Sequence, residues 1–277
     1  MRPPVYPECM ALPPLVDPLP ALTGAEAART ERHAALAGFG SLAQRRLAAS
    51  RVAVVGVGGL GSAVILALAA AGVGALVVID DDAVAVTNLH RQVLHGIGDV
   101  GRPKTDSAVR AAARLSPTTI VTPRPVRLDP ANADELLAGA HVVVDGSDTF
   151  ASRAAVAAAC ERRGVPLVWG AVEEFAGQAT VFWSAPPPGV TPVVLADLHP
   201  PDRAAGALSC SEAGVFGPLC LQVGAILAAE AVKLLTGVGR PLLGRVAVID
   251  AARGTHQEIP LAPSRERTAH AASTAAR

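Results

Sequence analysis

Three polar residues near the end of the first third of the chain could together bind a polyphosphate. Asn88 and Arg91 belong to the segment Thr-Asn-Leu-His-Arg-Gln at 87–92, and Lys104 follows thirteen residues after Arg91. A guanidinium can hold two phosphate oxygens at once, and a lysine ammonium supplies a mobile point charge. Lone basic residues are usually a solvated helix face, but this fixed order favours a triphosphate ligand.

A glycine-rich turn precedes these residues. Its glycines are Gly56, Gly58, Gly59 and Gly61, and Asp80 follows nineteen residues after Gly61. Glycines let the backbone approach a phosphate, and a helix N-terminus offers free N–H groups, while an acid at a strand end can bind ribose hydroxyls. This pattern alone describes an NAD site equally well, and a glycine turn without a ligand is a further, weaker alternative. Hydride transfer has no need for the amide and two cations beyond the acid, so the combination favours ATP.

An acidic turn, Asp145-Gly-Ser-Asp148-Thr149, follows another apolar stretch. Ligands of open α/β sheets bind at the carboxyl ends of the strands, which is where Asp148 is expected. Mg²⁺ takes oxygen ligands and shares them with phosphates, so Asp148 is a candidate ligand. Asp148 could instead cap the helix predicted from Phe150, and the two roles are compatible.

Alternating strands and helices must position these residues. The hydrophobic pattern predicts strands at 51–55, 75–80, 120–123, 141–145, 166–170, 178–183 and 245–250, and helices at 29–48, 60–71, 104–115, 132–137, 150–163 and 217–235. The predicted fold class is α/β: a Rossmann-like, doubly wound, mostly parallel sheet with a C-terminal extension of the sheet and a crossover loop at 186–206. Residues 1–25 are expected to be a flexible Pro-rich arm, 26–262 one domain and 263–277 a loose tail.

Composition limits the function classes. Lys plus Arg equals Asp plus Glu, 24 each, so no global basic field indicates nucleic acid. The apolar run 63–79 approaches membrane length, but Gly72 and Gly74 interrupt it, and a helix followed by a buried strand explains it better than a membrane span. Four cysteines without Cys-x-x-Cys spacing, and an N-terminus without a signal pattern, predict a cytoplasmic protein with reduced thiols.

In combination, these motifs resemble the ThiF/MoeB family of ubiquitin-activating-type adenylyltransferases. The resemblance extends from about Arg29 to Pro260, and its segments are 29–33, 56–61, 71–74, 80–82, 87–92, 101–104, 145–149, 175–178, 209–214 and 228–235. It implies that 26–262 is an adenylyltransferase domain using ATP and Mg²⁺. The implied reaction adenylates the C-terminal glycine carboxylate of a small ubiquitin-like sulfur-carrier protein ending in Gly-Gly.

The resemblance also implies roles for individual residues. A carboxylate is already a nucleophile, so catalysis reduces to positioning and charge stabilisation. The positions that match the nucleotide site are Gly58, Gly59, Gly61, Asp80, Asn88, Arg91, Lys104, Asp148 and Thr149, with Asp148 matching the magnesium ligand. The implied catalytic set is Arg32, Arg91, Lys104, Asp148 and Cys210.

Two of these catalytic residues carry further implications. Arg32 matches an arginine that reaches into the partner subunit's site, so a homodimer is implied; the alternative is an ordinary surface residue. Cys210 matches a cysteine used by several relatives in sulfur transfer or thioester chemistry. It lies in a polar Ser-Cys-Ser-Glu segment, whereas free cysteine is most often a small buried side chain.

The chain departs from the family at its zinc site. Many relatives hold a structural zinc with two Cys-x-x-Cys pairs, which would fall near Val194 and Asp197 and after about Pro263. Neither pair exists here, so we expect no zinc. Three alternatives stay open: the same ATP chemistry on a peptide or other small carboxylate in a specialised pathway, a non-catalytic nucleotide-binding scaffold, and an NAD-linked oxidoreductase.

Overall fold

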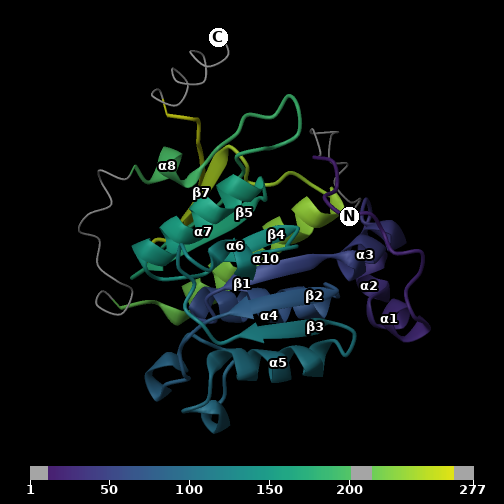
Figure 1. Ribbon diagram of the computed structural model, residues 1–277, viewed down its shortest axis with the longest axis horizontal. Coiled ribbons are helices and arrows are strands. Elements are labelled where there is room, and N and C mark those ends of the chain that lie inside the picture. The colour runs from purple at the N-terminus through teal and green to yellow at the C-terminus, as the bar shows by residue number, and fades with distance from the viewer. Residues whose placement is uncertain (1–11, 201–213, 265–277) are drawn as a thin grey trace.

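An eight-stranded sheet in the order β3-β2-β1-β4-β5-β6-β7-β8 runs through the part of the chain that the computed structural model describes, residues 12–200 and 214–264 (Figure 1). The strands are β1 Arg51–Val55, β2 Ala75–Ile79, β3 Ile120–Arg124, β4 Val142–Asp145, β5 Leu167–Glu173, β6 Ala176–Phe182, β7 Arg245–Asp250 and β8 Thr255–Pro260. The strands from β3 to β5 are parallel, and β6, β7 and β8 extend the sheet antiparallel. The predicted fold class is confirmed. The strand order reverses between β1 and β4.

Helices cover both faces of the sheet. They are α1 Gly24–Arg29, α2 Glu31–Ala34, α3 Gly40–Ala49, α4 Gly59–Ala71, α5 Lys104–Leu115, α6 Ala133–Leu136, α7 Phe150–Arg163, α8 Leu195–Leu198 and α10 Gly217–Thr236, with short 3-10 turns η1 Val86–Asn88 and η2 Ile97–Asp99. Alternate residues of one strand serve the two faces, so β1 buries Val52 and Val54 under α4 and α10, and Ala53 and Val55 on the side of α6 and α7. Burial on both faces explains why the parallel strands read as continuous apolar runs.

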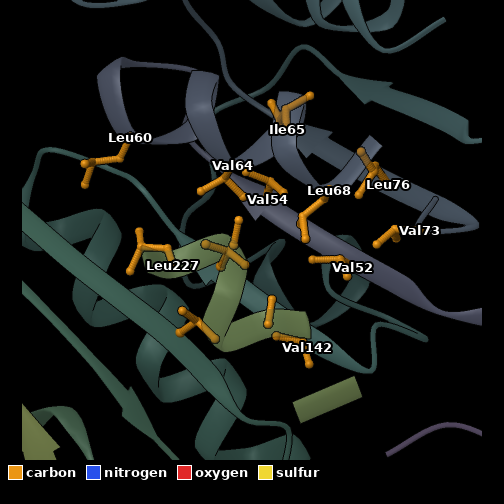
Figure 2. Packing of buried hydrophobic residues seen from close by; sticks show 14 of the residues in the cluster. Val52, Val54, Leu60, Val64, Ile65, Leu68, Val73, Leu76, Val142 and Leu227 are labelled. Atoms are coloured by element: carbon orange, nitrogen blue, oxygen red, sulfur yellow. The ribbon is translucent and has the colours of Figure 1, made fainter. Parts of the chain in front are cut away.

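The central core joins β1 to the two longest apolar helices. Figure 2 shows Val54 of β1 close to Val64 and Leu68 of α4, with Leu227 of α10 in the same cluster. By length and composition α10 could cross a membrane, but 61% of its most apolar window is buried inside the protein. It packs against α4, β5 and β6 as a core helix.

Two of the differences from the sequence prediction have a direct physical reason. The helix predicted over 29–48 is broken, because Gly38 and Gly40, with φ of 79° and 69°, turn the chain between α2 and α3. Strand β8 was not predicted, because its first four residues are polar and all six are exposed. Among the described residues it pairs with β7 alone and forms the outer strand of the sheet, where its side chains are exposed on both faces.

The described part of the predicted N-terminal arm packs on the domain. Val16 is buried in the core, and the Leu15 amide donates a hydrogen bond to the Leu234 carbonyl of α10 at 3.2 Å. These contacts attach Leu15 and Val16 to the domain, and the flexibility of residues 1–25 stays a prediction. Residues 1–11 and 265–277 of the predicted arm and tail lie outside the described residues.

Candidate functional site

A cleft opens where the strand order reverses, at the carboxyl ends of β1, β2 and β4. It encloses about 940 Å³, part of which is open to solvent. The structure brings most of the predicted nucleotide residues into its lining, namely Gly58, Gly59, Asp80, Arg91, Lys104, Asp148 and Thr149. Gly61 and Asn88 do not line it.

The glycine turn between β1 and α4 is shaped by close backbone contacts. Gly56 has φ of 87°, and a Cβ atom built on it would lie 2.8 Å from the Gly146 carbonyl oxygen. A Cβ on Gly61 would lie 1.9 Å from the Gly56 oxygen, and one on Gly59 would lie 2.8 Å from Cys220 Sγ. Gly61 therefore permits the turn to close, while Gly58 and Gly59 face the cleft. Cys220 is buried beneath the turn.

Asp80 anchors the glycine turn to the end of β2. Its Oδ2 accepts a hydrogen bond from the Val57 amide at 2.6 Å, and its Oδ1 accepts one from the Asp82 amide at 2.8 Å. Burial raises the pKa of Asp80, while the nearby Lys104 charge and these amides oppose the rise. The carboxylate oxygens of Asp80, Asp81 and Asp82 lie within 4.8 Å of one another.

The two predicted cations both reach the cleft. Lys104 is only 5% exposed, and its Nζ donates to Asp82 Oδ2 at 2.7 Å, so it is not a solvated helix-face lysine. Arg91 is half-buried, and its Nη1 donates to the Thr87 carbonyl at 3.2 Å. Asn88 instead uses its Oδ1 to accept from the Ala85 amide at 3.2 Å, which caps its own turn.

From the sequence, Asp148 could both bind Mg²⁺ and cap the helix that follows it. In the structure, another residue of the acidic turn is the cap. Thr149 is the N-cap of α7, and its Oγ1 accepts from the Ser152 amide at 3.2 Å. Asp148 is therefore not the cap, and its exposed carboxylate lines the cleft. Asp145 is 1% exposed, and its Oδ1 accepts from the Ser147 amide at 2.9 Å. Burial raises the pKa of Asp145, and the Arg153 charge opposes the rise.

Sequence reasoning missed several residues around the cleft. Gln92 and Arg153 line it, and buried His95 supports it by donating from Nε2 to the Val57 carbonyl at 3.0 Å. Burial lowers the pKa of His95 and so favours the neutral ring, and Nδ1 lies against the Ser107 hydroxyl. Gln92 was within the hexad, but only its 4% exposure and unpaired Oε1 indicate a site.

The structure does not bring Arg32 to the cleft of its own chain. Arg32 is exposed on α2, which lies with α1 and α3 at the amino-terminal end of the strands (Figure 1). Two contacts show this arrangement: Arg29 donates to the Ala70 carbonyl at the end of α4 at 2.7 Å, and the Gly74 amide before β2 donates to Leu47 of α3. Cys210 lies outside the described residues.

An aspartate, Asp197, stands at one of the two positions near which the first Cys-x-x-Cys pair of relatives would fall. Asp197 accepts from the Val194 amide at 2.9 Å and from the Ser264 amide at 2.8 Å. This carboxylate therefore links the start of α8 to the segment that follows β8. The two Cys-x-x-Cys pairs of relatives would fall in these same two segments. The expectation of no zinc stays a prediction from the sequence.

Comparison with known proteins relates the whole domain to one family. The sequence profile of the ThiF family matches residues 30–269. Over 252 residues the chain is 43% identical to the probable adenylyltransferase/sulfurtransferase MoeZ of Mycobacterium tuberculosis; the match covers 91% of this chain but only 64% of MoeZ. It is 42% identical over 238 residues to the sulfur carrier protein adenylyltransferase of Thermus thermophilus, covering 86% of this chain and 88% of that protein.

The fold also matches solved structures. A crystal structure of E. coli MccB with ATP superposes with a TM-score of 0.72 at 21% identity, covering 88% of this chain and 73% of that one. At this level of identity the likeness establishes the fold alone.

Proposed function

The chain belongs to the ThiF family, and we propose that it adenylates the C-terminal glycine carboxylate of a ubiquitin-like sulfur-carrier protein, with ATP as donor and pyrophosphate as leaving group. Two relatives at 42% and 43% identity, both named adenylyltransferases, support the reaction class. The observation that carries the proposal is the composition of the cleft. Gly59, Asp80, Arg91, Lys104 and Asp148 line a single cleft at the switch point of the sheet.

The cleft offers a binding group for each part of ATP. The backbone of the glycine turn and the N-terminus of α4 suit a phosphate, and the Asp80 carboxylate suits the ribose hydroxyls. Arg91 and Lys104 suit the charge that develops on pyrophosphate. A carboxylate oxygen of the carrier attacks the α-phosphorus, and the bond from that phosphorus to the leaving oxygen breaks with its electron pair. The products are an acyl-adenylate and pyrophosphate, and no proton must be removed.

The acidic residues of the cleft fit a magnesium site. Asp148 is exposed to the cleft and is not needed as a helix cap, since Thr149 has that role. Carboxylate oxygens are the donors that Mg²⁺ takes in nucleotide sites, and the three carboxylates at 80–82 converge nearby. Asp148 would hold the ion. Bound Mg²⁺ would neutralise part of the phosphate charge.

Isotope exchange between pyrophosphate and ATP tests the proposal. Exchange is expected only when a sulfur-carrier protein ending in Gly-Gly is added, because the reverse reaction needs the acyl-adenylate. Exchange supported by a short peptide but not by the carrier would favour the runner-up, the same chemistry on another carboxylate. Nucleotide binding without exchange in either mixture would identify a scaffold.

In this proposal the protein is a homodimer in which Arg32 completes the cleft of the partner. The support is that Arg32 is exposed at the end of the sheet opposite its own cleft. Mixing Arg32→Ala chains with Asp148→Ala chains should restore carrier-dependent exchange, because one site of each mixed dimer is then intact. Each variant alone is the control. Mixed dimers without activity, with mixing shown by a mass tag, would refute the role of Arg32.

A further inference from the structure

Arg153 is a cation of the cleft to which none of the roles above assigns a task. It lies on α7 in the turn after Asp148, and its Nε donates to the Ser147 carbonyl at 3.2 Å. Its guanidinium carbon lies 5.9 Å from the centre of the Phe150 ring and 5.6 Å from that of Trp169. Trp169 is fully buried, so this platform is rigid. The aromatic contacts hold Arg153 in one position without using its hydrogen bonds.

The terminal nitrogens of Arg153 are available for a ligand. Within residues 12–200 and 214–264, its one hydrogen bond uses Nε, and it forms no salt bridge. The nearby buried carboxylate of Asp145 accepts a hydrogen bond from the Ser147 amide through Oδ1. Its Oδ2 has no hydrogen-bond partner among the described residues. Arg153 is held by its aromatic contacts, and its terminal N–H groups have no partner among the described residues. It is therefore suited to bind an anion in the cleft.

The topology separates Arg153 from the groups expected to hold the nucleotide. The glycine turn and Asp80 follow β1 and β2, on one side of the point where the strand order reverses. Arg153 follows β4, on the other side, where Val172 of β5 and Val215 also line the cleft. Beyond them Phe175 and Phe216 form an exposed pair, with ring centres 5.2 Å apart. The rim of the cleft on the β5 side of this point is therefore apolar, and an acceptor that enters there reaches the cleft that Arg153 also lines.

We propose that Arg153 binds the attacking carboxylate of the acceptor and holds it toward the α-phosphorus of ATP. A guanidinium matches a carboxylate in geometry and charge, and the N-terminus of α7 adds a positive dipole end. The oxygen that is not attacking pairs with Arg153. The other oxygen forms the new bond to phosphorus, and the electron pair of the broken bond leaves with pyrophosphate. This inference rests on the proposed function.

A carrier with an altered C-terminus tests this pairing. A sulfur-carrier protein ending in Gly-Gly carboxylate and the same protein ending in Gly-Gly amide are each titrated into the full-length protein by calorimetry. The natural protein should bind the carboxylate form about tenfold or more tightly, as expected of a charge-assisted hydrogen bond. Arg153→Gln should lose this preference, and Arg153→Lys should keep part of it. An equal preference in the natural protein and Arg153→Gln would overturn the inference.

Two controls separate this pairing from other roles. Arg162→Gln changes an exposed arginine on the same helix that pairs with Asp134, and it should leave the preference unchanged. ATP affinity is measured for every variant without carrier. A loss of ATP affinity as large as the loss of preference would assign Arg153 to a phosphate and overturn the inference. If the natural protein shows no carrier-dependent pyrophosphate exchange, the proposed function itself fails.

Discussion

Two strand-turn-helix units meet at the cleft, and they contribute different groups to its lining. The turn from β1 to α4 presents backbone, because Gly56 and Gly61 are packed too closely for side chains. The turn from β4 to α7 presents side chains, with Asp148 and Arg153 in the cleft lining. The first unit therefore suits a phosphate, and the second suits charged groups that must be placed individually. The β1–α4 and β4–α7 units thus have the same architecture but are suited to different chemical groups in one site.

The two turns are also held in different ways. The glycine turn is anchored from outside, by Asp80 and His95 bound to the Val57 amide and carbonyl. The acidic turn is held from within, by Asp145 on the Ser147 amide and by Thr149 on the Ser152 amide. We therefore expect changes in the first turn to affect folding and changes in the second to separate into function and stability.

The largest effect is expected for Gly61→Ala. The new methyl would lie 1.9 Å from the Gly56 oxygen, and backbone on both sides cannot move away. We expect a loss of about 3 kcal/mol in the free energy of unfolding, measured with urea. Gly98→Ala is the control, because nothing lies within 4 Å of its new methyl. Equal stability of the two variants would contradict the close-packed turn.

Asp148→Asn should affect activity without affecting folding. Carrier-dependent pyrophosphate exchange should fall about 10²–10³-fold, the usual loss when one group that stabilises transition-state charge is removed. The midpoint of thermal unfolding should not change, because Asp148 is exposed and caps no helix. Asp134→Asn, an exposed acid paired with Arg162, is the matched control and should keep full activity. Full exchange in Asp148→Asn would remove Asp148 from the mechanism.

Thr149→Ala, in the adjacent residue, should lower stability because it removes a helix cap. Removing the N-cap hydroxyl of α7 should cost about 1 kcal/mol of unfolding free energy in urea. Thr149→Ser retains the hydroxyl and should recover most of that stability. If Asp148→Ala destabilises the protein as much as Thr149→Ala, the assignment of the cap is wrong.

The smallest effect is expected for the pH dependence contributed by His95. Burial lowers the pKa of His95, so the folded state favours the neutral ring. Its contribution to stability is complete above the unfolded pKa of about 6.5 and is lost as the pH falls below it, because the unfolded chain then takes up the proton. The unfolding free energy of the natural protein minus that of His95→Gln should therefore decrease from pH 7 to pH 5. A difference that does not vary with pH would contradict a buried neutral ring.

Much of the fold could be predicted, because local patterns matched what the tertiary structure requires. Helix α7 and strand β7 begin and end where the sequence predicted, since alternation and apolar runs are unbroken there. Strand β8 was missed because an exposed outer strand needs no apolar residues. The break after α2 was missed because it depends on Gly38 and Gly40 adopting positive φ.

The candidate site was predicted where its residues are close in sequence. Arg91 and Lys104 were recognised together, and both line the cleft. Arg153 had no such signal, because the residues that follow it in the helix are mainly alanines and the nearest charged ones, Glu161, Arg162 and Arg163, lie two turns further along. Its selection required Trp169, which reaches it only because β5 pairs with β4.

The sequence by itself determined the strand-glycine-helix unit, its following acid and the two cations, because these act through spacing along one stretch of chain. Only the tertiary structure decided which residue does what around them. In the structure Gly61 allows the glycine turn to close, and Thr149 rather than Asp148 caps α7. Arg32 lies at the end of the sheet opposite the cleft of its own chain. The physical reason is that these roles depend on contacts between β1, β4 and β5, which parallel pairing joins across long stretches of sequence.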